Sequence, residues 1–105
     1  MTNKIICIDF DGVIHKAGVG SKPGRPIYDE PTEGAVFTLR NLAKEFELVV
    51  LTSRPKEDFK KIEEWLHSYG FPIMRITNVK PNARAYIDDR AIRFTTWSDI
   101  VHYFL

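Results

Sequence analysis

Cysteine, long apolar runs and net charge are all scarce in this sequence. The 105 residues include one cysteine, Cys7, which cannot form an internal disulfide and gives no sign of an oxidising compartment. No segment approaches the roughly 18 apolar residues of a membrane span, and the first residues lack the charged and apolar regions of a signal peptide. The net charge of +1 excludes a global attraction to nucleic acid or membrane surfaces. We therefore expect a cytoplasmic protein with no membrane partner.

What the sequence does contain is an alternation of strand-like and helix-like segments, in a chain whose length suits one domain, residues 1–105. Short apolar or β-branched runs predict strands at residues 4–10, 46–51, 71–77 and 85–87. Apolar residues at helical spacing predict helices at 33–45, at 55–69 and from 96 onward. This alternation indicates an α/β fold with a mainly parallel sheet, helices on both faces and right-handed crossovers, as in a Rossmann-like three-layer α/β/α sandwich.

Local signals support the predicted helix ends and identify one long loop. Thr32 suits an N-cap, Pro55 a first helical position and Gly70 a C-terminal cap. The segment 96–99, Thr-Trp-Ser-Asp, resembles a capping box. Residues 11–31 are rich in glycine and proline and predict a long loop, which in a compact domain is usually functional.

Polar side chains follow all four predicted strands. Taken singly, each has an ordinary explanation as a turn, a helix cap or a solvated loop residue. Because the carboxyl ends of parallel strands meet at one sheet edge, where ligands bind in such folds, their joint occurrence favours a functional site. The set consists of Asp9 and Asp11 after the first strand, Thr52, Ser53 and Arg54 after the second, Lys80 after the third, and Asp88 and Asp89 after the fourth.

The four carboxylates of this set predict a metal site. Asp9, Asp11, Asp88 and Asp89 at one edge would repel one another and shift toward protonation in the absence of a cation. All-oxygen ligation suits Mg2+. Hydroxyls and free backbone amides at the start of a helix favour an anion. The pattern therefore predicts a phosphate held by Mg2+, Lys80 and the segment that begins at Thr52.

Four segments, in this order, resemble the motifs of the haloacid dehalogenase superfamily. They are Asp-Phe-Asp-Gly-Val at 9–13, the apolar strand that ends at Thr52, Lys80, and Ile-Asp-Asp at 87–89, and the resemblance spans residues 4–89. It implies a Rossmann-like fold and a magnesium-dependent phosphatase. It also implies roles for individual residues. Asp9 would be the nucleophile that forms an aspartyl-phosphate, and Asp11 the acid and base whose backbone carbonyl also binds the metal. Thr52 and Lys80 would be phosphate ligands, and Asp88 with Asp89 would be magnesium ligands.

The sequence departs from the usual family pattern in two places. The intervals 12–51 and 53–79 are filled by the predicted loop, helices and strands, so neither leaves room for the cap domain that the family inserts there. Ser53 and Arg54 after Thr52 resemble the hydroxyl-x-Arg segment of polynucleotide-kinase phosphatase domains, which implies that Arg54 binds the substrate. The chain therefore resembles a small capless member of the superfamily.

The substrate class stays open between a small phosphorylated molecule and the phosphorylated end of a nucleic acid. Without a cap, specificity has to come from the loop 11–31, from a neighbouring subunit of a homo-oligomer or from the substrate itself. If the predicted loops converge, their basic residues would form a rim suited to a polyanion. If the loops do not converge, these residues would be solvated surface charges. These residues are Lys16, Lys22, Arg25, Arg54, Lys56, Lys80, Arg84, Arg90 and Arg93.

Two other readings of the same residues stay open. One is a catalytically idle phosphoryl-binding or regulatory domain, such as a signalling receiver, in which the acceptor aspartate ends the third strand and the lysine ends the last. Here Asn78 follows the third strand and Lys80 precedes Asp88, which argues against that reading. The other is a phosphotransferase, because an aspartyl-phosphate can pass to another alcohol. Of the histidines, His67 and His102 are expected on helix surfaces, and His15 receives no role.

Overall fold

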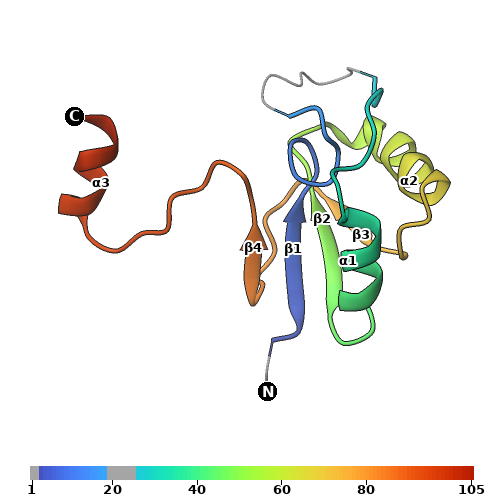
Figure 1. Ribbon diagram of the computed structural model, residues 1–105, viewed down its shortest axis with the longest axis horizontal. Coiled ribbons are helices and arrows are strands. Elements are labelled where there is room, and N and C mark those ends of the chain that lie inside the picture. Colours follow the sequence, from blue (N-terminus) through green and yellow to red (C-terminus); the bar gives the residue numbers. More distant parts are fainter. Residues whose placement is uncertain (1–2, 19–25) are drawn as a thin grey trace.

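The computed structural model describes residues 3–18 and 26–105, which form a four-stranded, all-parallel sheet with three α-helices (Figure 1). The strand order is β3-β2-β1-β4. The elements are β1 (Ile5–Asp9), α1 (Ala35–Leu42), β2 (Glu47–Leu51), the 3-10 turn η1 (Lys56–Asp58), α2 (Phe59–Ser68), β3 (Arg75–Thr77), β4 (Ala85–Ile87) and α3 (Trp97–Phe104). The α/β class and the parallel sheet are confirmed, the arrangement is compatible with a Rossmann-like sandwich, and the described residues include no cap domain.

The main core lies between the sheet and the helices α1 and α2. The chain passes from β1 to β2 to β3 in one direction across the sheet, and two right-handed crossovers in the same direction put both helices on the same face. Alternate residues of β1 and β2 point to this face in register, Ile6 with Leu48 and Ile8 with Val50. The core consists of Ile6, Ile8, Phe10, Ile14, Leu39, Leu48, Val50, Ile62, Trp65, Leu66 and Phe71.

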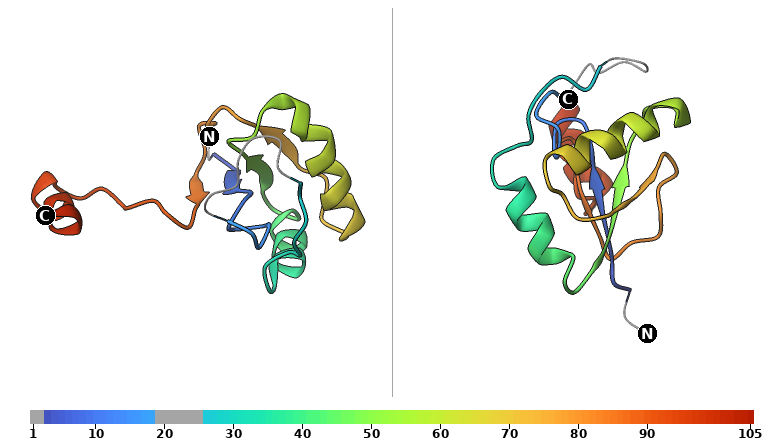
Figure 2. Two further views of the ribbon diagram at one scale, coloured as in Figure 1. Left: turned by 90° about the horizontal axis from the view of Figure 1, so that it is seen from above. Right: turned by 90° about the vertical axis from the view of Figure 1, so that its right-hand side faces the viewer.

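The opposite face of the sheet is covered by the connection between β3 and β4, residues 78–84, which runs behind β1 and β2 (Figure 2). Cys7 and Val49 point to this face and are buried. Tyr86, the register partner of Cys7, donates its hydroxyl to the carbonyl of Pro81 at 2.7 Å. A connection this short cannot contain a crossover helix, so the helices α1 and α2 cover one face of the sheet and a loop crosses the other.

The helix α3 lies apart from the sheet, at the end of an extended segment (Figure 1). Thr96 caps it as predicted, since the Thr96 hydroxyl accepts from the backbone N–H of Asp99 at 3.1 Å. The reciprocal half of the capping box is missing, because the Asp99 carboxylate accepts from the hydroxyl of Thr95 instead. No residue of α3 is buried. None of the helices in residues 3–18 and 26–105 is long and apolar enough to cross a membrane.

Several predicted boundaries are wrong at their ends. The first helix begins after Gly34, whose φ is 81°, and Thr32 does not cap it, because the Thr32 hydroxyl donates to the carbonyl of Val13. Pro55 is extended and precedes the 3-10 turn, which is a common start for a helix. The third strand is confined to Arg75–Thr77, because the segment 71–74 does not pair with β2 and contains Pro72, which lacks an N–H donor.

Candidate functional site

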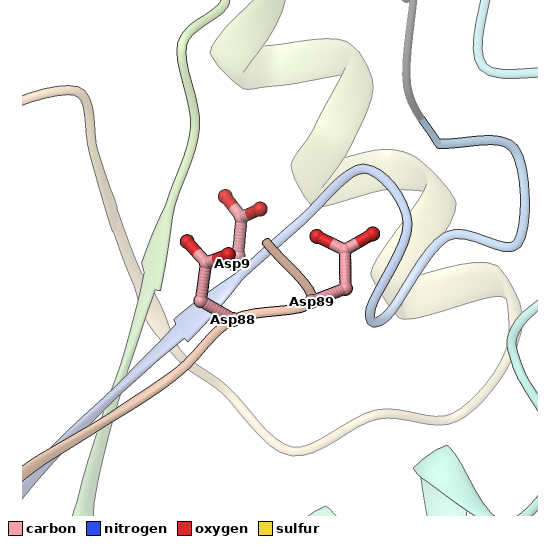
Figure 3. A group of neighbouring side chains, drawn as sticks. All are labelled: Asp9, Asp88 and Asp89. Carbon is pink, nitrogen blue, oxygen red and sulfur yellow. The ribbon is translucent and has the colours of Figure 1, made fainter. Parts of the chain in front are cut away.

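Three carboxylates meet at the carboxyl end of the sheet. Asp9 is the last residue of β1, and Asp88 and Asp89 follow β4, which pairs with β1. Each offers one carboxylate oxygen, and these oxygens lie within 4.8 Å of one another. Figure 3 shows the Asp9 and Asp88 side chains next to each other, with Asp89 beside the loop that leaves β1. Parallel pairing of β1 and β4 therefore brings the first and last predicted motifs together.

The crowding acts on Asp9. Burial, followed by the charges of Asp88 and Asp89, raises the pKa of Asp9 to about 6. Asp9 is only partly exposed, whereas Asp88 and Asp89 are exposed. A cation between these oxygens would favour the ionised form of Asp9 and remove the repulsion. The three side chains could therefore hold a metal ion, and their all-oxygen donor set fits a hard divalent cation such as Mg2+.

Gly12 makes room for this cluster. Its φ of 86° lies in the left-handed region, which side chains other than glycine rarely adopt. A Cβ at Gly12 would lie 2.6 Å from Oδ2 of Asp89, closer than real Cβ contacts come. The backbone conformation therefore requires a glycine in the Asp-Phe-Asp-Gly segment, and a side chain there would also have to displace the Asp89 carboxylate.

Asp11 does not belong to the group of three carboxylates, and its side chain contacts Arg54 and His15. The Arg54 Nε donates to Oδ2 of Asp11 at 2.9 Å and Nη2 donates to Oδ1 at 3.1 Å. The His15 Nδ1 lies 2.9 Å from the same Oδ1. The crowding of carboxylates expected for all four aspartates is thus found at Asp9, while the neighbours of the Asp11 side chain are a guanidinium and an imidazole.

Arg54 is buried in this network, with 2% of its surface exposed. Its Nη1 lies 3.6 Å from Oδ2 of Asp58, which is also buried. Burial lowers the pKa of Arg54, but the hydrogen bonds and charge of Asp11, followed by those of Asp58, outweigh it and raise the pKa above its usual value. All three guanidinium nitrogens therefore face carboxylates of the protein itself.

His15 is a site residue that the sequence analysis missed. Its ring is fully buried, stacked on Phe10 at 5.4 Å between centroids and in edge contact with Trp65 at 5.4 Å. The backbone N–H of Asp29 donates to Nε2 at 3.1 Å, so the ring proton is on Nδ1 and is donated to Asp11. The available signal was the position of His15 four residues after Asp11 in a glycine-rich loop.

The residues after β2 take two different environments. Thr52 is buried, its N–H donates to the carbonyl of Thr77, and its hydroxyl accepts from the backbone N–H of Arg54 at 3.0 Å. Ser53 is exposed at the start of the turn toward η1. Thr52 therefore fixes the turn that carries Ser53 outward and Arg54 inward.

Lys80 lies on the same face of the sheet as Asp9. Cys7 and Asp9 are two residues apart on β1 and point to the same face of the sheet. Tyr86, the register partner of Cys7, points to this face as well. The Lys80 Nζ lies 4.4 Å from the centroid of the Tyr86 ring. Burial, followed by the charge of Asp9, raises the pKa of Cys7, and the positive charge of the neighbouring Lys80 partly opposes this shift. Within the described residues, no hydrogen bond or ion pair joins Lys80 or Ser53 to the three carboxylates.

Comparison with known proteins adds no relative: no family model, no curated protein and no solved structure matches the chain. The resemblance to the haloacid dehalogenase superfamily therefore stays a prediction from four short segments. The structure itself shows an α/β fold and, at the carboxyl edge of its sheet, a carboxylate cluster that could hold a metal ion.

Proposed function

We propose that this protein is a Mg2+-dependent phosphohydrolase that cleaves phosphate monoesters through an aspartyl-phosphate on Asp9. The observation that carries the proposal is the meeting of Asp9 with Asp88 and Asp89, within 4.8 Å, at the edge where parallel α/β sheets bind ligands. A partly buried carboxylate beside two others has an unfavourable charge until a cation is bound. Such a site draws together a cation and the phosphate that the cation attracts.

The reaction consists of two displacements at phosphorus. A carboxylate oxygen of Asp9 forms a bond to phosphorus while the bond from phosphorus to the alcohol oxygen breaks, and the departing alkoxide takes a proton from Asp11. Water then attacks the phosphorus of the acyl phosphate and gives a proton to Asp11. The bond from phosphorus to Asp9 breaks, so that phosphate leaves and the Asp9 carboxylate is restored. Mg2+, held by Asp9, Asp88, Asp89 and the backbone carbonyl of Asp11, would supply charge neutralisation for the phosphate oxygens.

Several residues around Asp9 suit the phosphate. Lys80 shares the face of Asp9, and its ammonium lies over the ring of Tyr86. Among the described residues no salt bridge engages it, so it can contribute a positive charge to the site. The exposed Ser53, on the turn fixed by Thr52, supplies a hydroxyl beside β2. Arg54, also predicted as a phosphate ligand, has its guanidinium on Asp11 and Asp58 instead.

The substrate that we propose is an accessible phosphate, either on a small molecule or at a nucleic-acid end. No cap encloses the cluster in the described residues, and Asp88 and Asp89 are exposed. Of the predicted basic rim, Lys56, Lys80, Arg84, Arg90 and Arg93 are exposed, Lys16 pairs with Glu30 at 3.3 Å, and Lys22 and Arg25 lie outside the described residues. Comparison of kcat/KM for phosphorylated oligonucleotides and for sugar phosphates at several salt concentrations distinguishes the two classes, because contacts with a polyanion weaken steeply with salt.

The proposal is tested by phosphate release from a panel of monoesters. We expect turnover with Mg2+, none with excess chelator, and none for Asp9→Asn, which keeps the shape of the side chain but removes the nucleophile. Asp99→Asn in α3, away from the cluster, is the matched control and should retain full activity. Product analysis with an added alcohol separates transfer to that alcohol from transfer to water. Undiminished turnover in chelator or in Asp9→Asn would contradict the proposal.

A further inference from the structure

We propose that Arg54 and His15 are positioning residues that hold the Asp11 carboxylate, and that Arg54 acts on the reaction through Asp11 without binding the substrate phosphate. This inference rests on the proposed function for its catalytic consequence, although the clamp itself is a property of the metal-free protein. It changes the role that the sequence pattern predicts for Arg54, from a substrate ligand to a support for the acid and base.

The first support is the complete engagement of the guanidinium. Nε and Nη2 donate to the two oxygens of Asp11 at 2.9 and 3.1 Å, and Nη1 faces Asp58 at 3.6 Å. The side chain is 2% exposed. A substrate phosphate could take this guanidinium only by breaking a buried two-point contact with a carboxylate, the geometry in which arginine binds most strongly.

The second support is the third donor on Asp11. His15 donates from Nδ1 to Oδ1 at 2.9 Å, and its other nitrogen accepts from the Asp29 N–H at 3.1 Å, which fixes both the tautomer and the ring orientation. The ring is packed between Phe10 and Trp65 and cannot turn freely. A carboxylate has about four acceptor positions, so three of those on Asp11 are occupied and one is left for the proton that Asp11 gives to the leaving alcohol and takes from water.

A buried network beside the exposed carboxylates Asp88 and Asp89 suits a supporting role. A general acid or base works when its geometry is held close to the productive one by fixed neighbours. Asp11 lies two residues beyond the end of β1, in the connection that follows the strand. Arg54 from the turn after β2 and His15 from the loop after β1 supply that support, and Asp58 from η1 in turn holds Arg54.

A double-mutant cycle on turnover of p-nitrophenyl phosphate tests the catalytic part. We expect Arg54→Gln to lower kcat by about 10- to 100-fold, as loss of an outer-sphere support typically does, with KM little changed. Arg54→Lys keeps the charge but not the two-point contact and should recover only part of the loss. In the Asp11→Asn background, Arg54→Gln should cause almost no further loss. A large rise in KM, with an equal loss in both backgrounds, would show that Arg54 binds phosphate and would overturn the inference.

A measurement on metal-free protein separates this inference from the proposed function. In 1H–15N spectra of the imidazole at neutral pH, we expect the Nδ1–H tautomer for His15, unchanged in Asp99→Asn and lost or exchanging in Asp11→Ala. An Nε2–H tautomer in the wild type would overturn the clamp even in an active enzyme. If the clamp is observed and no monoester is hydrolysed, the proposed function fails and the clamp stands. If Arg54→Gln unfolds, Arg54→Lys takes its place in the kinetic cycle.

Discussion

Asp9 is a partly buried carboxyl group whose pKa is raised to about 6, chiefly by burial and then by Asp88 and Asp89. Because the folded state holds this proton more tightly than the unfolded state does, the contribution of Asp9 to stability is greatest below about pH 4 and is lost as the pH rises through about 6. For the metal-free protein the loss is about 1–2 kcal/mol once solvent screening of a partly exposed group is allowed for.

Urea unfolding in chelator between pH 4 and 8 checks this prediction. Asp9→Asn should be more stable than the wild type near pH 7 and equal to it, or less stable, near pH 4. Added Mg2+ should restore the stability of the wild type at pH 7, because a ligand of the folded state stabilises it. Parallel pH profiles for the two proteins would show that Asp9 carries no such penalty.

At Gly12 the effect of the contact with Asp89 can be separated from that of the backbone conformation, because Gly34 provides a matched control. Both have positive φ, 86° and 81°, but a Cβ at Gly12 meets Asp89 while a Cβ at Gly34 meets nothing within 4 Å. Gly34→Ala should cost about 1–2 kcal/mol for the left-handed backbone alone. Gly12→Ala should cost at least as much and also weaken Mg2+ binding, measured by calorimetry. Equal Mg2+ affinity in the two variants would show that the close approach of Gly12 to Asp89 does not matter for metal binding.

At the scale of elements, Thr32 links the start of α1 to the loop after β1. Its hydroxyl donates to the carbonyl of Val13 and its N–H donates to the carbonyl of Ile14 at 3.0 Å. Thr32→Val should cost about 0.5–1.5 kcal/mol through the lost hydrogen bond and should speed amide exchange at His15. Thr38→Val, an exposed position of α1, is the control and should change neither. Faster exchange confined to the first turn of α1 would favour the N-cap role originally expected for Thr32.

The sequence predicted the existence and order of the elements but not all of their ends. Continuous apolar runs identified β1 and β2, and helical spacing identified α1 and α2, because burial of those residues dominates the local energetics. The end signals were less reliable. Thr32 has a good N-cap side chain, but a carbonyl of a distant loop competes for its hydroxyl, and that partner is not visible in local sequence.

The same limit applies to the candidate site. The proximity of Asp9, Asp88 and Asp89 could be predicted from the expected parallel sheet alone, because neighbouring parallel strands end at the same edge. The direction of the Asp11 side chain could not be predicted in this way. It depends on the buried partners Arg54 and His15, and a buried arginine or histidine looks the same in sequence as an exposed one.

At the scale of the whole molecule, stability resides in the sheet and the two helices packed on it. Ile62 in α2 is fully buried in the core, whereas Val101 in α3 is 47% exposed. Ile62→Ala should lower the free energy of unfolding by about 2–5 kcal/mol, and Val101→Ala should change it by less than about 0.5 kcal/mol. Urea denaturation followed by Trp fluorescence and by circular dichroism measures both. A large destabilisation by Val101→Ala would show that α3 packs against the rest of the protein.

The proposed role of Asp9 as the nucleophile is tested by the mass of the peptide 5–16 after acid quench of a reacting mixture. During turnover with Mg2+ this peptide should gain one phosphoryl group, on Asp9, and it should gain none in Asp9→Asn or in chelator. The Asp11→Asn protein should accumulate more of the modified peptide, because hydrolysis of the acyl phosphate needs the base. Phosphate release by the wild type with Asp9 unmodified, or a phosphoryl group carried by another residue, would show that Asp9 is not the nucleophile.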